Sequence, residues 1–106
     1  MRDLVKESIF NLIDHSNKFS CKIHNSEILD LFSGSGSFGL ECISRNAKSV
    51  TFVENYQEAL HTLKKNIKSL DFKNKIEVIE KNCFDFFRSK QDFTKKYDLI
   101  FMDPPY

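Results

Sequence analysis

Residues 27–54 read EILDLFSGSGSFGLECISRNAKSVTFVE, and this stretch carries the pattern that decides the fold. A short apolar run over residues 27–32 stops at a Ser/Gly cluster, and residues 38–45 follow with apolar side chains at helical spacing. Residues 49–54 are β-branched and aromatic, which indicates a second strand. The stretch therefore predicts a strand, a tight turn, a helix and a parallel strand joined by a right-handed crossover.

Similar patterns lie on both sides of this stretch, where apolar residues recur at helical or strand spacing. The remaining predicted segments are an amphipathic helix over residues 3–14, a loop over 15–26, a helix over 56–70, a strand over 76–80, a short helix over 83–88 and a strand over 98–102. Alternating strands and helices predict an α/β fold with a parallel sheet. A chain of 106 residues holds one domain at most, and we expect a single, partial domain over residues 1–106.

Charge and composition exclude several classes of protein. The net charge is only +1, so charge alone does not point to nucleic acid. The cysteines and histidines lack the spacing of a zinc site, a dithiol or a catalytic triad, so no metal site is expected. We interpret the cysteines, Cys21, Cys42 and Cys83, as buried small residues. We interpret the histidines, His15, His24 and His61, as surface or packing residues.

The same composition argues against a membrane or secreted protein. No apolar run approaches the ~20 residues that span a bilayer. The first residues, MRDLVKESIF, carry acids and lack the apolar core of a signal peptide. We therefore expect a cytoplasmic protein that does not bind a membrane.

A glycine-rich turn and one acid predict the ligand class. Gly34-x-Gly36-x-x-Gly39 lies between a predicted strand and a predicted helix, where glycines let a ligand approach and the helix presents free N–H groups. Glu54 ends the second strand, 20 residues after Gly34, where an acid accepts hydrogen bonds from ribose hydroxyls in nucleotide-binding βαβ folds. These features predict an adenosine-containing ligand, without choosing between NAD and S-adenosylmethionine.

The sequence Asp103-Pro104-Pro105-Tyr106 makes that choice. It follows a strand that should lie beside the first strand. Two prolines stiffen the turn and donate no backbone hydrogen bonds, so its carbonyl groups are free to accept. With a carboxylate before them and an aromatic ring after them, they form a rigid cup suited to a flat group that bears N–H donors.

Together these motifs resemble the class I amino-methyltransferases of nucleic acids, and more narrowly the RsmD-like 16S rRNA guanine-(N2)-methyltransferase family. The similar segments are KESIFN over residues 6–11, DLFSGSGSFGLECISRNAKSVTFVE over 30–54 and YDLIFMDPPY over 97–106. The resemblance implies a Rossmann-like class I methyltransferase fold with sheet order 3-2-1-4. The family also has a basic β-rich extension before the first helix and later strands after the proline motif. We expect both to be missing here, as in a chain truncated at both ends.

The resemblance implies methyl transfer from S-adenosylmethionine to the exocyclic amino group of a guanine in 16S rRNA, by a monomer acting on the rRNA or a small-subunit ribosomal particle. Asn82 would contact the adenine amino group and the Cys83 backbone its ring edge, while Asp30 would order the glycine loop or meet the ammonium group of the cofactor. The implied cofactor-binding residues are Asp30, Phe32, Gly34, Gly36, Glu54, Asn82 and Cys83, and the implied catalytic residues are Asp103, Pro104, Pro105 and Tyr106.

Three alternatives remain open from the sequence. A DNA adenine-N6 methyltransferase would share the proline motif, because it also methylates an exocyclic amine. An inactive fragment that binds cofactor would fit the missing strands. A dinucleotide-dependent oxidoreductase would explain the glycine turn and Glu54, but it leaves Asp103–Tyr106 without a role.

Overall fold

The computed structural model describes residues 22–89 and 96–102. The predicted helix over 3–14, Cys21, His15 and the proline motif at 103–106 lie outside the described residues. The elements are β1 (Glu27–Leu31), α2 (Ser37–Ser44), β2 (Ser49–Val53), α3 (Gln57–Lys68), the short 3₁₀ helix η1 (Lys73–Lys75), β3 (Ile76–Ile79), α4 (Cys83–Arg88) and β4 (Leu99–Met102). Except for η1, each was predicted to within two residues at either end.

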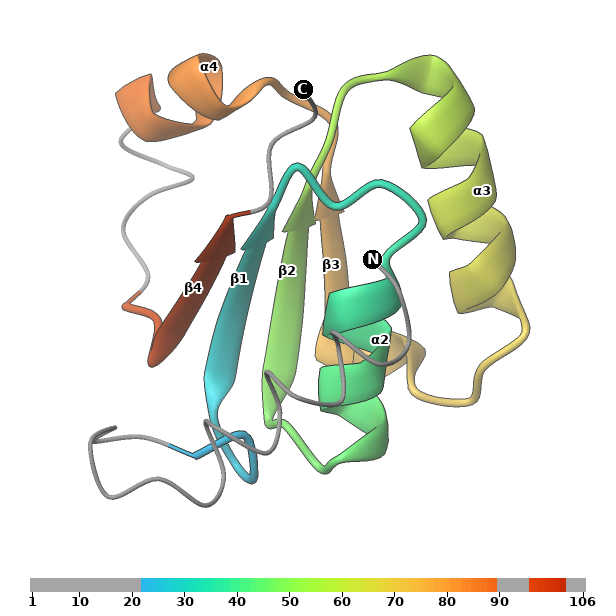
Figure 1. The fold of residues 1–106 in the computed structure, drawn as a ribbon, viewed down its shortest axis with the longest axis vertical. Helices are drawn as coiled ribbons and strands as arrows, with labels where there is room; N and C mark the ends of the chain where they lie inside the picture. Colours follow the sequence, from blue (N-terminus) through green and yellow to red (C-terminus); the bar gives the residue numbers. More distant parts are fainter. Residues whose placement is uncertain (1–21, 90–95, 103–106) are drawn as a thin grey trace.

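The four strands form one parallel sheet in the order β3-β2-β1-β4. The predicted order 3-2-1-4 is therefore confirmed. Leu31 at the end of β1 pairs with Val53 on β2 and with Met102 on β4. All four arrows in Figure 1 point to the same end of the molecule, so the loops that leave the strands gather at one edge.

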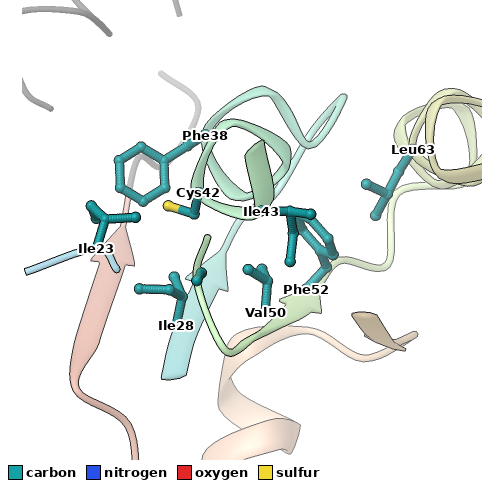
Figure 2. Close-up of a cluster of buried hydrophobic side chains, with 9 residues drawn as sticks. Ile23, Ile28, Phe38, Cys42, Ile43, Val50, Phe52 and Leu63 are labelled. Carbon is teal, nitrogen blue, oxygen red and sulfur yellow. The ribbon is translucent and has the colours of Figure 1, made fainter. Parts of the chain in front are cut away.

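Helix α2 packs on one face of the sheet. Phe38, Cys42 and Ile43 are buried on its inner side, at the spacing of one helical face. Figure 2 shows them above Val50 of β2 and Ile28 of β1. A Cβ at Gly39 would lie only 2.3 Å from the Phe52 ring, so glycine permits the close approach of helix and sheet.

Helix α3 completes this face with an amphipathic stripe. Leu60 and Leu63 are buried against the core, and Figure 2 shows Leu63 entering the cluster from the side. Lys64, Lys65 and Lys68 are exposed, as predicted for a solvated face. Lys64 forms a 2.8 Å ion pair with Glu80 between two half-exposed side chains, which is worth little in stability.

The opposite face holds a smaller cluster that fixes α4. Leu29, Leu31 and Val53 are buried together with Phe86, a side chain of α4. Burying a phenylalanine contributes roughly 1.5–3 kcal/mol. This contact anchors α4 near the carboxyl ends of the strands (Figure 1), next to the loop that leaves β1.

Candidate cofactor site

The carboxyl edge of the sheet brings three of the predicted segments together. The glycine loop leaves β1, Glu54 follows β2, and Asn82 with Cys83 follows β3. From β1 the chain adds β2 and β3 on one flank, and after β3 it crosses back to add β4 on the other flank of β1. In open α/β sheets, ligands bind outside the carboxyl ends of the strands at such a switch point.

The backbone of the loop adopts positive φ at three residues: Phe32 at 55°, Gly34 at 57° and Gly36 at 83°. A turn closed by the Gly36 N–H donating to the Ser33 carbonyl at 2.9 Å holds this shape. A Cβ built at Gly34 would meet no atom within 4 Å, so the loop faces open space there. Gly34 therefore presents bare backbone to whatever approaches from that side.

Asp30 lies beneath the loop and supports the start of α2. Its side chain is buried, with 2% of the residue exposed, and Oδ2 accepts a hydrogen bond from the Gly39 N–H at 3.2 Å. The N-cap residue, Gly36, has no side chain that could accept a hydrogen bond from the first turn of α2. The Asp30 carboxylate, on β1, instead accepts from an N–H group of that turn. This contact ties the first turn of α2 to the end of β1.

Glu54 and Gly34 are in direct contact. Glu54 Oε1 accepts a hydrogen bond from the Gly34 N–H at 2.9 Å. Oε2 accepts from the N–H groups of Asn55 and Tyr56, at 3.2 Å and 3.1 Å. The carboxylate predicted to meet the ribose thus also fixes the loop, a contact that sequence spacing alone did not reveal.

Asn82 has a structural task in α4. Its Oδ1 accepts from the Asp85 N–H at 2.8 Å, and its Nδ2 donates to Asp85 Oδ2 at 3.1 Å. This is an N-cap, and the Asn-x-x-Asp spacing could have indicated it. The resemblance predicts that the Asn82 side chain contacts adenine. Such a contact would have to use the hydrogen-bonding positions of Oδ1 and Nδ2 that Asp85 does not occupy.

The Cys83 thiol lies where the three loops meet. Burial raises its pKa, a hydrogen bond from the Phe32 backbone opposes that shift, and the nearby Glu54 carboxylate adds to it. Phe32 and Cys83 also pack against the cluster around Phe86. The Phe32 backbone and the Glu54 carboxylate therefore both act on the Cys83 thiol.

Two further findings concern metal binding and membrane spans in the described part of the chain. Within residues 22–89 and 96–102, no group of three or more His, Cys, Asp or Glu side chains is placed to hold a metal ion. Across the same residues, every helix is too short or too polar to cross a bilayer. His24 and His61 are exposed, in line with the surface role predicted for them.

A protein-family model, described as conserved hypothetical protein 95, matches residues 1–106. The chain belongs to this family. The resemblance to the RsmD-like methyltransferases is confirmed by the same match and by similarity to Ribosomal RNA small subunit methyltransferase D of Haemophilus influenzae. That relative is 41% identical over 105 residues, which cover 98% of this chain and 51% of the relative. The chain spans about half the length of the curated relatives it matches.

Solved structures of other proteins share the fold of this chain. A protein of Escherichia coli with a provisional methyltransferase assignment superposes with a TM-score of 0.83, at 30% identity, over 99% of this chain and 54% of its own. The protein SMU.776, with a similar assignment and complexed with SAH, gives a TM-score of 0.73 at 21% identity, over 96% of this chain and 25% of its own. The predicted class I methyltransferase fold is confirmed.

Proposed function

We propose that this chain binds S-adenosylmethionine and takes part in methyl transfer to the exocyclic amino group of a guanine in 16S rRNA. The observation that carries the proposal is the contact between Gly34 and Glu54, a bare glycine backbone open to solvent beside a carboxylate at the end of β2. The name of the Haemophilus influenzae relative supports a small-subunit rRNA substrate. The SAH complex of SMU.776 supports the cofactor.

The residues at the carboxyl edge suit this cofactor. The loop at Gly34 and Gly36 would receive the methionine part, because a side chain at Gly34 would fill the open space there. Glu54 would accept from the ribose hydroxyls with lone pairs not used by Gly34, Asn55 and Tyr56. Asn82, Cys83 and Phe32 would border the adenine, while Asp30 supports the loop from below.

The chemistry of methyl transfer is mainly a matter of alignment. When bound, the sulfonium cofactor supplies an already activated methyl group, so the chain must hold the attacking nitrogen in line with it. An exocyclic amino group is a poor nucleophile because its lone pair is shared with the ring. Hydrogen bonds from its N–H groups to the Asp103 carboxylate and the Pro104 carbonyl would favour attack and offset the developing positive charge.

The rest of the proline motif would hold the base. Pro105 would keep the turn stiff, and Tyr106 would stack on the guanine, a contact worth about 1–3 kcal/mol. The base has to leave its own stack to enter this cup. Since Met102 pairs with Leu31, β4 brings the chain that leads to Asp103 alongside the start of the glycine loop. We further propose that the enzyme is cytoplasmic and acts as a monomer on the rRNA or the small-subunit particle, without a metal because the sulfonium methyl is already activated.

Calorimetry with SAH and with NADH tests the ligand class. We expect SAH to bind and NADH not to bind, and Glu54→Ala to weaken SAH binding by about 1.5–3 kcal/mol, the usual contribution of a hydrogen bond to a charged group. Binding of NADH in place of SAH would favour the oxidoreductase alternative. Glu58→Ala, in the first turn of α3, is a control that removes an exposed carboxylate bonded to the Tyr56 hydroxyl and leaves the bond between Glu54 and Gly34 in place.

Transfer of labelled methyl groups tests the substrate. We expect label in 16S rRNA, recovered as N2-methylguanine after digestion to nucleosides. Label recovered only as N6-methyladenine in DNA would support the DNA methyltransferase alternative. SAH binding with no transfer to any nucleic acid would support the cofactor-binding fragment.

A further inference from the structure

The glycine loop is also held from its outer side, by helix α3. Asn66, in the last turn of α3, donates a hydrogen bond from Nδ2 to the Ser35 carbonyl oxygen at 2.9 Å. One turn earlier, Leu63 packs so near Gly36 that a Cβ there would lie 2.4 Å from Leu63 Cδ1. Helix α3 therefore contacts two consecutive residues of the loop.

The Asn66 bond fixes the orientation of a single peptide unit. The carbonyl of the Ser35–Gly36 peptide points to Asn66, and its N–H points back to the Ser33 carbonyl at 2.9 Å. Both polar groups of this peptide are thus satisfied within the chain. Because Gly36 has φ 83° and glycine readily adopts other conformations, this peptide needs such contacts to keep one orientation.

The loop is consequently held from two directions. Glu54 binds the Gly34 N–H from β2, and Asn66 binds the Ser35 carbonyl from α3. Between these two anchors lies the surface at Gly34 that is open to a ligand. An ordered loop loses less conformational entropy when a ligand binds, which increases affinity.

We propose that Asn66 is a positioning residue, which fixes the Ser35–Gly36 peptide and so shapes the loop surface that receives the methionine part of the cofactor. This inference rests on the proposed function, since it assumes that the loop binds S-adenosylmethionine. Asn66 acts through the loop and does not touch the reacting atoms. It lies 31 residues from Ser35 in the sequence, so no local motif reveals the contact.

The test compares Asn66→Ala and Asn66→Asp with the unmodified protein. Asn66→Ala removes the donor, and because alanine favours helix, α3 should stay folded. Asn66→Asp keeps the size but sets a carboxylate against the Ser35 carbonyl. We expect the Gly36 amide to exchange with solvent deuterium several-fold faster in both variants. The Kd for SAH should rise about 3- to 10-fold in Asn66→Ala, the effect of one neutral hydrogen bond, and further in Asn66→Asp.

Lys65→Gly is the matched control. Lys65 is the exposed neighbour of Asn66 on α3, and glycine there lowers the stability of the helix without removing the bond to Ser35. We expect this variant to melt at a lower temperature and to bind SAH as the unmodified protein does. In methyl-transfer assays Asn66→Ala should raise the KM for S-adenosylmethionine while kcat at saturating cofactor stays unchanged.

Several results would overturn the inference. One is a Kd for SAH within twofold of the unmodified protein in both Asn66 variants, whether or not Gly36 exchange rises. Another is Lys65→Gly weakening SAH binding as much as Asn66→Ala, which would trace the effect to helix stability. These outcomes are distinct from failure of the proposed function, which would appear as no SAH binding by the unmodified protein.

Discussion

Gly34 and Gly39 belong to the same glycine motif but have different surroundings. A Cβ at Gly34 would meet nothing within 4 Å, whereas one at Gly39 would lie 2.3 Å from the Phe52 ring. We predict that Gly39→Ala destabilises the fold by about 1–3 kcal/mol through overpacking and leaves SAH affinity nearly unchanged in the folded protein. Urea unfolding and calorimetry measure the two effects.

Gly34→Ala should show the opposite balance. Its positive φ of 57° costs an alanine about 1–2 kcal/mol, but the added methyl meets no protein atom. The methyl enters the space assigned to the cofactor, so SAH affinity should fall at least about tenfold, or ~1.4 kcal/mol. Equal SAH affinity in Gly34→Ala and the unmodified protein would show that the ligand does not approach this face of the loop.

The raised pKa of Cys83 predicts a slow thiol and a pH-dependent stability. The thiolate is the reactive form, so at pH 8 iodoacetamide should label Cys83 more slowly than a free cysteine, in a protein with Cys21 and Cys42 replaced by serine. A group whose pKa is raised on folding stabilises the fold below its unfolded pKa and loses that contribution as the pH rises through the folded pKa. Unfolding titrations of the same protein with and without Cys83→Ala should therefore diverge only at alkaline pH. Cys83 is only partly buried, less than the sequence predicted, and labelling at the rate of free cysteine would contradict even that partial burial.

At the scale of elements, α4 depends on one cap and one buried ring. We predict that Asn82→Ala lowers the free energy of unfolding by about 1 kcal/mol, because the Asp85 N–H loses its acceptor. Asn82→Ser keeps a capping oxygen and should retain most of that stability. If Asn82 also recognises adenine through its amide, both variants should weaken SAH binding. Normal SAH binding by the serine variant would leave the residue with the cap alone.

Element boundaries in this chain follow local signals, and their exact ends follow tertiary contacts. The apolar periodicity of the sequence predicted α2 and α3, because each helix buries one face on the sheet. The 3₁₀ helix η1 was not predicted, since Lys73–Lys75 carry no apolar pattern. The Asn82 cap has a local signature, whereas the Asn66 contact with Ser35 links residues 31 positions apart and needs the folded sheet to appear.

At the scale of the whole molecule, sheet order converts sequence positions into a site. The adjacent parallel strands β1, β2 and β3 gather Gly34, Glu54 and Cys83 at one edge of the sheet. What the motifs did not predict is that these residues hold one another: Glu54 binds Gly34, and Phe32 contacts the Cys83 thiol. Such contacts depend on side-chain directions at the loop ends, which spacing alone does not specify.

In the proposed function the cofactor would bind beside β2, and the base would be held by residues that follow β4. We predict that Asp103→Ala leaves SAH binding nearly unchanged, because the glycine loop is held by Glu54, which follows β2 on the other flank of β1. The transfer step should slow by at least ~10²-fold, the usual cost of losing one preorganised hydrogen-bonding group at a reacting centre. The loss should appear in kcat, because the interaction strengthens as the nitrogen becomes charged.

Tyr106→Ala should instead raise the KM for RNA as well, since stacking holds the base before the chemistry begins. Single-turnover transfer of labelled methyl to 16S rRNA measures both variants. A wild-type rate for Asp103→Ala would make Asp103–Tyr106 a structural turn, and the nitrogen would then need another acceptor on the β4 side.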